Sequence, residues 1–150
     1  MNQEACETKQ YNFICSRDTL DGVYPSLVLA LNSVRLGHKA TIFYTFMGLN
    51  VLKPGAARKL KYHMPGFLGA IPGMSTLAAW MMKRQIGEAN IPDVEELMEM
   101  AQIEGVRFVA CHMTMDMMKL KKEDLIEDVE IQTAEEFLKQ AEGCHINMFT

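Results

Sequence analysis

The sequence lacks the cysteine spacings that usually mark a zinc site or a redox pair. Its 150 residues contain four cysteines, and no two of them form a C-x-x-C pair. No cysteine and histidine spacing matches a zinc knuckle, so we expect no bound metal and no tightly bound cofactor. The first residues, MNQEACETKQ, lack the pattern of a signal peptide. Together these absences predict free thiols in a reducing cytoplasm.

Strong positive charge and common nucleotide-binding motifs are missing as well. The formal net charge is −4 and no basic run occurs, which argues against nucleic-acid binding. The chain contains neither G-x-x-x-x-G-K-[ST] nor G-x-G-x-x-G, and it has no G-x-S-x-G elbow. The standard phosphate loops and the serine-hydrolase nucleophile are therefore excluded.

What the sequence does contain is an alternation of short apolar runs with amphipathic segments. After a loose tail at 1–9, strands are predicted at 11–16, 40–46, 106–111, 129–132 and 145–149. Helical patterns separate them, with Pro25 expected in the first turn of one helix and Gly37 at its end. Thr133 and Glu136 predict a capping box for another helix. The pattern is typical of a single α/β domain with a mainly parallel sheet covered on both faces.

One inserted segment, taken as 55–87, breaks this alternation. Within it, residues 64–82 (MPGFLGAIPGMSTLAAWMM) carry no charged side chain and reach the length of a membrane span. Pro65 and Pro72 interrupt any single helix, and only 74–86 reads as a continuous one, which is too short to cross a bilayer. We expect burial against the domain or a second subunit. A partner-docking surface and peripheral membrane contact are the weaker alternatives.

Sulfur chemistry, if present, is expected at the carboxyl ends of the strands, where open α/β sheets bind ligands. Three stretches directly follow predicted strands and are therefore expected at this edge: CSRDTLD, TFMGL and CHMTMD. This placement brings Cys15 and Cys111 to one edge of the sheet and leaves Cys144 at the opposite edge. The two thiols at the shared edge are the candidate reactive groups.

Cys111 has the stronger physical case of the two. A helix that begins after it, capped by Thr114 or Asp116, would place backbone N–H groups and a positive dipole end near the sulfur, which favours a thiolate. The alternative is an inert buried cysteine, since free cysteines are often buried. His112 either tunes this thiol or is a loop residue. Cys15 is either a core residue or a second, resolving thiol.

Three longer stretches resemble the DsrE/DsrF/DsrH-like family, in the branch with an inserted glycine- and methionine-rich segment. They are CSRDTLDGVYPSLVLALNSVRLGHKATIFYTFMGLNVL, MPGFLGAIPGMSTLAAWMMKR and GVRFVACHMTMDMMKLKKEDL, and the resemblance extends from about Tyr11 to Phe149. It implies a three-layer α/β/α domain with a five-stranded parallel sheet, assembly as trimers or hexamers, and no required cofactor. It also implies that a cysteine after a strand carries sulfane sulfur as a persulfide. Cys111 occupies that position.

The leading hypothesis is therefore a cytoplasmic sulfur-relay protein, a sulfurtransferase whose partners are donor and acceptor proteins with reactive cysteines. A second hypothesis is a peroxiredoxin-like thiol redox protein that uses Cys111 with Cys15 as its resolving thiol. It predicts a disulfide between them, which requires Cα atoms within about 7 Å. A third hypothesis is a non-catalytic subunit of a sulfur-relay complex.

Overall fold

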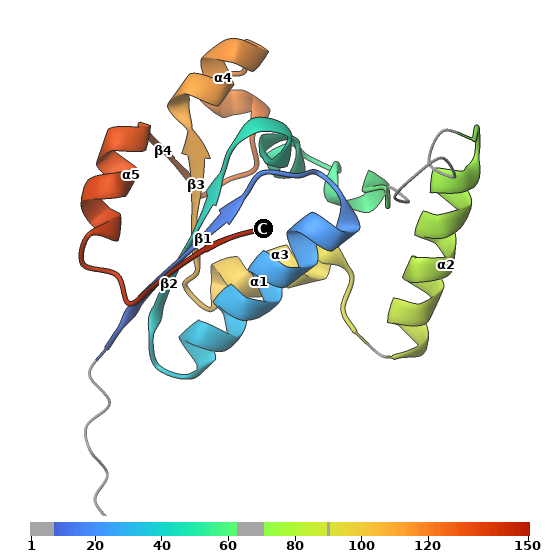
Figure 1. The fold of residues 1–150 in the computed structure, drawn as a ribbon, viewed down its shortest axis with the longest axis horizontal. Helices are drawn as coiled ribbons and strands as arrows, with labels where there is room; N and C mark the ends of the chain where they lie inside the picture. The colour runs from blue at the N-terminus through green and yellow to red at the C-terminus, as the bar shows by residue number, and fades with distance from the viewer. Residues whose placement is uncertain (1–7, 63–70, 90) are drawn as a thin grey trace, which may run out of the picture.

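A five-stranded parallel sheet forms the centre of the protein (Figure 1). The computed structural model describes residues 8–62, 71–89 and 91–150. The strands are β1 (Gln10–Cys15), β2 (Lys39–Tyr44), β3 (Arg107–Cys111), β4 (Val129–Gln132) and β5 (Ile146–Phe149). They lie in the order β4-β3-β2-β1-β5, and every neighbouring pair is parallel. The predicted α/β fold with five parallel strands is confirmed.

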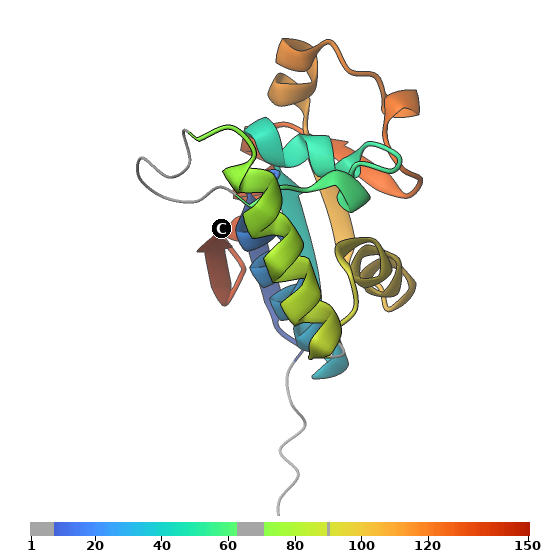
Figure 2. The ribbon, with the colours of Figure 1, turned by 90° about the vertical axis from the view of Figure 1, so that its right-hand side faces the viewer.

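Helices cover the two faces of the sheet unequally. The α-helices are α1 (Leu20–Arg35), α2 (Met74–Glu88), α3 (Val94–Ile103), α4 (His112–Met118) and α5 (Ala134–Ala141). Short 3-10 helices are η1 (Phe46–Leu52), η2 (Ala57–Lys59) and η4 (Lys122–Asp124). Helices α1 and α3 pack together on one face, α5 lies on the other, and α4 extends from the end of β3 (Figures 1 and 2). This is the predicted three-layer α/β/α arrangement.

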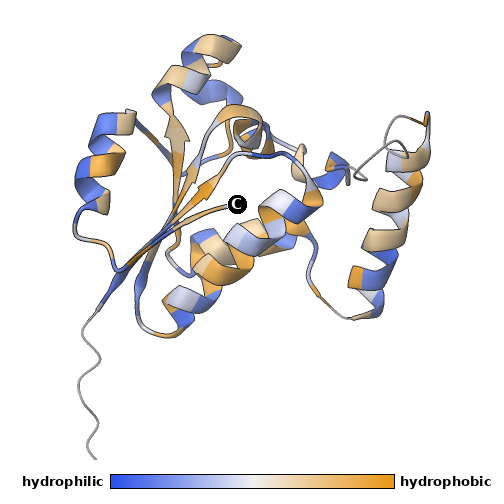
Figure 3. Cartoon of the chain, in the orientation of Figure 1, coloured by the Kyte–Doolittle hydropathy of each residue, from blue (hydrophilic) through white to orange (hydrophobic). Residues whose placement is uncertain are grey.

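Two separate apolar clusters fill the spaces between these layers. Because side chains alternate along a strand, Phe13, Tyr44 and Phe108 face α1 and α3 and join the larger cluster. The cluster on the α5 face is small. Its buried members are Phe43, Val109, Cys111 and Phe137, with Ile14 packed against them. In Figure 3 the central strands are coloured hydrophobic, whereas α5 is largely hydrophilic with one hydrophobic band.

Local signals explain most helix ends, with one error at the start of α1. This helix begins at Leu20, so Pro25 lies in its interior and not in the predicted first turn. Proline there removes one helical N–H donor, a cost that the buried apolar face of α1 offsets. Gly37 has φ +84 and follows the helix end, as predicted. The capping box of Thr133 and Glu136 begins α5, as predicted.

The inserted segment behaves differently from the prediction. Residues 63–70 lie outside the described part of the chain, and the continuous helix expected from residue 74 is α2. Ala79 is the only residue of α2 that is buried, while Leu77, Trp80 and Met81 are exposed. Figure 1 shows α2 at the side of the molecule, beyond α1 and α3. Ala79 belongs to the large cluster and Met82 packs against it. Burial of this helix against its own domain is therefore only partial, and burial against a second subunit stays a prediction.

Among the described helices, none combines the length and the apolar character that crossing a bilayer requires. For α2, the charged residues Lys83, Arg84 and Glu88 occupy its second half.

Candidate functional site

The carboxyl edge of the sheet brings the ends of β1, β2 and β3 side by side. Cys15 is the last residue of β1, and Cys111 is the last residue of β3. Strand β2 lies between them, with Tyr44 paired to Cys15 on one side and to Ala110 on the other. The two cysteines therefore lie within one residue of the same level, and their predicted placement at this edge is confirmed.

The two thiols nevertheless point to opposite faces of the sheet. Cys111 belongs to the small cluster on the α5 face, and Cys15 to the large cluster under α1. Neighbouring strands are about 4.8 Å apart, so the intervening β2 separates the two backbones by about 9–10 Å. A disulfide needs Cα atoms within about 7 Å. This separation argues against Cys15 as a resolving thiol for Cys111, a role that stays a prediction.

Cys111 is buried at the junction of β3 and α4. The residue is 3% exposed, and it is the N-cap of α4, which begins at the very next residue. Thr114 and Asp116 therefore lie inside the helix, and their predicted role as caps is wrong. The first N–H groups of a helix have no acceptor within it, so the first turn of α4 presents donors near this cysteine.

Thr114 has a different role, which the sequence did not reveal. Its buried hydroxyl lies 3.2 Å from the hydroxyl of Thr45 and accepts a hydrogen bond from the Phe46 N–H, also at 3.2 Å. Phe46 has φ +46, a left-handed conformation that costs a side-chain-bearing residue about 1–2 kcal/mol. Thr114 thus ties α4 to the loop after β2 and holds Phe46 in its strained position. A hydroxyl three residues after a strand was the only available signal.

The glycine in TFMGL has a steric explanation. A Cβ on Gly48 would lie 2.3 Å from the carbonyl oxygen of Cys15. The Gly48 N–H also donates to the Ser16 carbonyl oxygen at 3.0 Å. The loop after β2 therefore packs directly on the end of β1, and only glycine permits that approach.

His112 is the first residue of α4, and its side chain contacts the same helix one turn further along. Its imidazole Nδ1 lies 3.2 Å from the Asp116 carboxylate, and its side chain is 56% exposed. The pKa of Glu136 is lowered first by the hydrogen bonds from Thr133 and, to a smaller extent, by the nearby His112. Tuning of the Cys111 thiol by His112 stays a prediction.

Cys15 has the environment of a structural cysteine. It is fully buried, and burial raises the pKa of its thiol. The sulfur donates to the Arg17 carbonyl oxygen at 3.5 Å. A neutral thiol without solvent access is a poor nucleophile, since the thiolate is the reactive form. Of the two readings of Cys15, its surroundings support the core residue.

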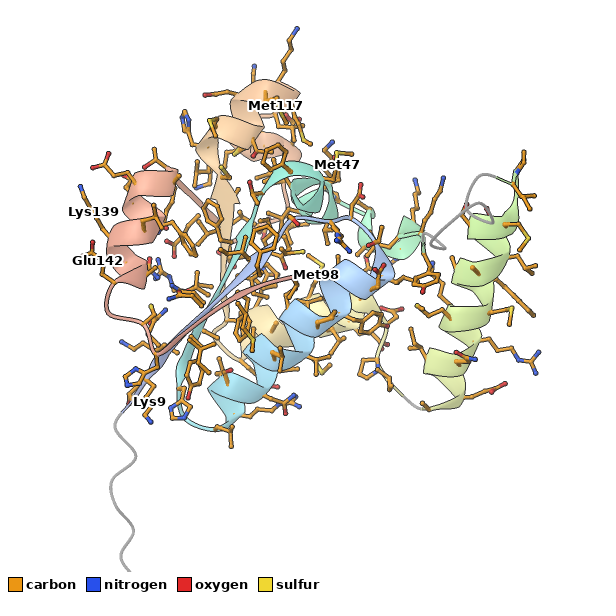
Figure 4. All side chains as sticks on the ribbon, viewed as in Figure 1. Lys9, Met47, Met98, Met117, Lys139 and Glu142 are labelled. Atoms are coloured by element: carbon orange, nitrogen blue, oxygen red, sulfur yellow. The ribbon has the colours of Figure 1, made fainter. Side chains whose placement is uncertain are left out.

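Exposed apolar side chains surround the edge where Cys111 lies. We call this group the edge patch; its members come from η1 and α4 and are Phe46, Met47, Met113 and Met117. The hydrogen bonds of Thr114 fix these two elements to one another. Figure 4 shows Met47 and Met117 at the same end of the molecule. Flexible methionines at an exposed surface are typical of adaptable binding sites.

Comparison with known proteins identifies the family. Residues 7–149 match the DsrE/DsrF/DrsH-like family. The chain belongs to this family. It is 31% identical over 149 residues to the sulfur carrier protein DsrE2 of Allochromatium vinosum, an alignment that covers 90% of this chain and 94% of that protein. It is 27% identical over 163 residues to the uncharacterized protein YrkE of Bacillus subtilis, covering 95% and 98% of the two chains.

The fold of this DsrE-like chain also has a counterpart among solved structures. The Escherichia coli protein ychN superposes with a TM-score of 0.63 at 14% identity, and the match covers 96% of this chain and 100% of ychN. At that identity the likeness concerns the fold alone.

A cleft of about 570 Å³ opens between η1 and η2 in this DsrE-like chain. Its lining includes Met47 of the edge patch together with Asp18, Lys59 and Lys61. Cys144 lies near the amino ends of the strands, as expected, where its sulfur accepts a hydrogen bond from the Asn12 amide at 3.1 Å. Cys6 lies outside the described residues. Within residues 8–62, 71–89 and 91–150, no three His, Cys, Asp or Glu side chains are grouped to hold a metal ion.

Proposed function

We propose that this protein is a sulfur carrier, a sulfurtransferase of a cytoplasmic relay, that holds sulfane sulfur as a persulfide on Cys111. Membership of the DsrE/DsrF/DrsH-like family and 31% identity to a sulfur carrier protein support a role in sulfur relay. The observation that carries the choice of residue is the position of Cys111. It ends a strand at the carboxyl edge and begins α4 as its N-cap, whereas Cys15 is enclosed on the other face.

The chemistry is a pair of thiol–persulfide exchanges. The Cys111 thiolate attacks the outer sulfur of a donor persulfide, a new S–S bond forms, and the donor S–S bond breaks as the donor thiolate leaves. The acceptor thiolate then attacks the outer sulfur of Cys111–S–SH, and Cys111 leaves as a thiolate. Each exchange conserves electrons, so no external oxidant or reductant is required.

The edge patch provides the contact surface for donor and acceptor proteins. Phe46, Met47, Met113 and Met117 are exposed at the same edge as the thiol. A partner that covers them excludes water from the exchange and gains the free energy of apolar burial. We expect Met113→Lys combined with Met117→Lys to weaken transfer to a protein acceptor while sulfur uptake from a small persulfide is kept.

Intact mass spectrometry after exposure to a persulfide donor tests the proposal. The wild-type chain should gain the mass of one sulfur atom, and Cys111→Ser should gain none. Cys15→Ser and Cys144→Ser are the matched controls and should keep the gain. Absence of sulfur addition to the wild type with every donor tried would contradict the carrier function.

The burial of Cys111 favours one second candidate. A thiol in a residue that is 3% exposed is also what a non-catalytic subunit of a sulfur-relay complex would carry. That candidate predicts that Cys111→Ser leaves both partner assembly and sulfur flux through the complex unchanged. The carrier predicts that assembly persists and flux is lost.

A further inference from the structure

A persulfide exchange at Cys111 requires a route to a buried sulfur. The attacking atom must approach the sulfur directly, and thiol exchange rates depend on that access. Cys111 is 3% exposed and shares its cluster with Phe43, Val109 and Phe137. Phe43 and Val109 belong to the sheet itself. The only member contributed by another layer is Phe137, which comes from α5.

The attachment of α5 to the sheet is weak. Phe137 is its only buried residue, and its ring stacks on Phe43 with a centroid distance of 4.3 Å. Two long hydrogen bonds of Gln140 also join the helix to the sheet: its amide donates to Thr41 at 3.4 Å and accepts from Gln132 at 3.5 Å. An eight-residue helix is far shorter than a helix that is stable in isolation. A segment with so few buried apolar contacts opens at a lower free energy than the global fold.

The other element next to Cys111 is held more firmly. In α4, Met115 is buried in the large cluster on the opposite face, and Thr114 is bonded to Thr45 and Phe46. Movement of α4 would break these hydrogen bonds and remove Met115 from the large cluster. Movement of α5 would separate one aromatic pair and leave the large cluster intact.

We propose that α5 is a cover over Cys111, and that Phe137 is the positioning residue that controls access to its thiol. The inference rests on the proposed function, because only a reactive Cys111 needs a cover that opens. Detachment of α5 exposes the sulfur together with the apolar faces of Phe43 and Phe137. A partner that binds these faces as well as the edge patch stabilises the open state.

Alkylation by iodoacetamide under native conditions, followed residue by residue with peptide mass spectrometry, tests the cover without any sulfur donor. Cys15 is an internal reference, because it is enclosed on the opposite face under α1 and reacts only when the large core opens. In the wild type, Cys111 should react faster than Cys15 and slower than a cysteine in an unfolded peptide. When opening is faster than alkylation, the rate follows the population of the open state.

Two variants should raise the Cys111 rate without changing the Cys15 rate. Phe137→Ala removes the contact and should accelerate alkylation of Cys111 at least about tenfold, in line with the loss of a buried aromatic side chain. Thr133→Ala removes the N-cap of α5 and leaves the cluster unchanged. It should accelerate alkylation of Cys111 about fivefold, which corresponds to the loss of a typical N-cap. Leu138→Ala, a matched truncation on the same helix at a residue 63% exposed, should change the rate by less than about twofold.

The outcomes separate this proposal from the carrier function. Equal acceleration of Cys111 and Cys15 in both variants would mean global unfolding and would overturn the cover. So would a wild-type Cys111 rate equal to that of an unfolded peptide. If alkylation behaves as expected but no persulfide forms with any donor, the cover stands and the carrier function fails. If Phe137→Ala does not fold, the capping variant alone decides.

Discussion

The two faces of the sheet carry one cysteine each at the same edge, yet they are covered in different ways. On one face, α1 and α3 enclose Cys15 in the large apolar cluster. On the other, Cys111 lies in a small cluster to which the short helix α5 contributes a single buried side chain. Both thiols are almost fully buried, so exposure alone does not distinguish them. The distinction lies in how much apolar contact must be broken to uncover each sulfur.

The largest expected effect comes from truncating a matched phenylalanine on each face. Phe108→Ala on the α1 face should lower the free energy of unfolding by about 3–5 kcal/mol, because this residue is fully enclosed and its neighbours cannot collapse onto the space. Phe137→Ala on the α5 face should cost less, about 1–3 kcal/mol, because α5 can detach. Urea unfolding followed by circular dichroism measures both. Equal costs would break the comparison between the faces.

The next effect concerns the close packing of Gly48 on the end of β1. Gly48→Ala would force a Cβ to within 2.3 Å of the Cys15 carbonyl oxygen, and we expect a loss of at least about 2 kcal/mol. Gly87→Ala in α2 is the control, since no atom lies within 4 Å of its added Cβ. That change should be neutral or stabilising by up to about 1 kcal/mol, owing to better helix propensity. An unchanged free energy of unfolding in Gly48→Ala would show that the loop after β2 does not pack tightly on the end of β1.

A smaller effect is expected at the contact between α4 and the loop after β2. Thr114→Val keeps the shape of the side chain but removes the acceptor for the Phe46 N–H, and we expect a loss of about 1–2 kcal/mol. Thr114→Ser keeps the hydroxyl and should lose less. Amide hydrogen exchange at Phe46 should speed up in the valine variant alone. Unchanged exchange there would mean that Thr114 does not hold the strained loop.

The smallest effect concerns an exposed ion pair on the α5 face, where the Arg107 guanidinium donates to the Glu130 carboxylate at 2.9 Å. This hydrogen bond lowers the pKa of Glu130 below its ordinary value of 4.5. The stabilisation is therefore present above pH 4.5 and is lost as the pH falls through the lower pKa of the folded state. At neutral pH, Glu130→Gln should cost less than about 1 kcal/mol.

Urea unfolding at several pH values tests that sign. The difference between the wild type and Glu130→Gln should close as the pH is lowered below 4.5. Arg107→Gln should remove the same pH dependence, because it removes the hydrogen-bond donor. A difference that grows on acidification would contradict the assignment.

Much of the fold follows from patterns that are local in sequence. The five apolar runs, the capping box of Thr133 and Glu136 and the stop at Gly37 each depend on a few neighbouring residues. The error at Pro25 arose because a helix with a large buried face tolerates a proline that local rules place in its first turn. The error at α2 has the opposite origin: its apolar composition predicted burial, but the described chain supplies no surface that covers Leu77, Trp80 and Met81.

The sequence by itself determined the parallel α/β sheet and placed Cys15 and Cys111 at its carboxyl edge, because strand ends are marked locally and parallel strands end at the same side. Only the tertiary structure decided which face each thiol occupies. Alternation assigns a side chain to one of two faces, and a shift of one residue exchanges them. Which helices cover each face, and how firmly, depends on contacts between residues far apart in the chain. Those contacts separated Cys15 from Cys111, joined Thr114 to Phe46 and brought Phe137 into the apolar cluster that contains Cys111.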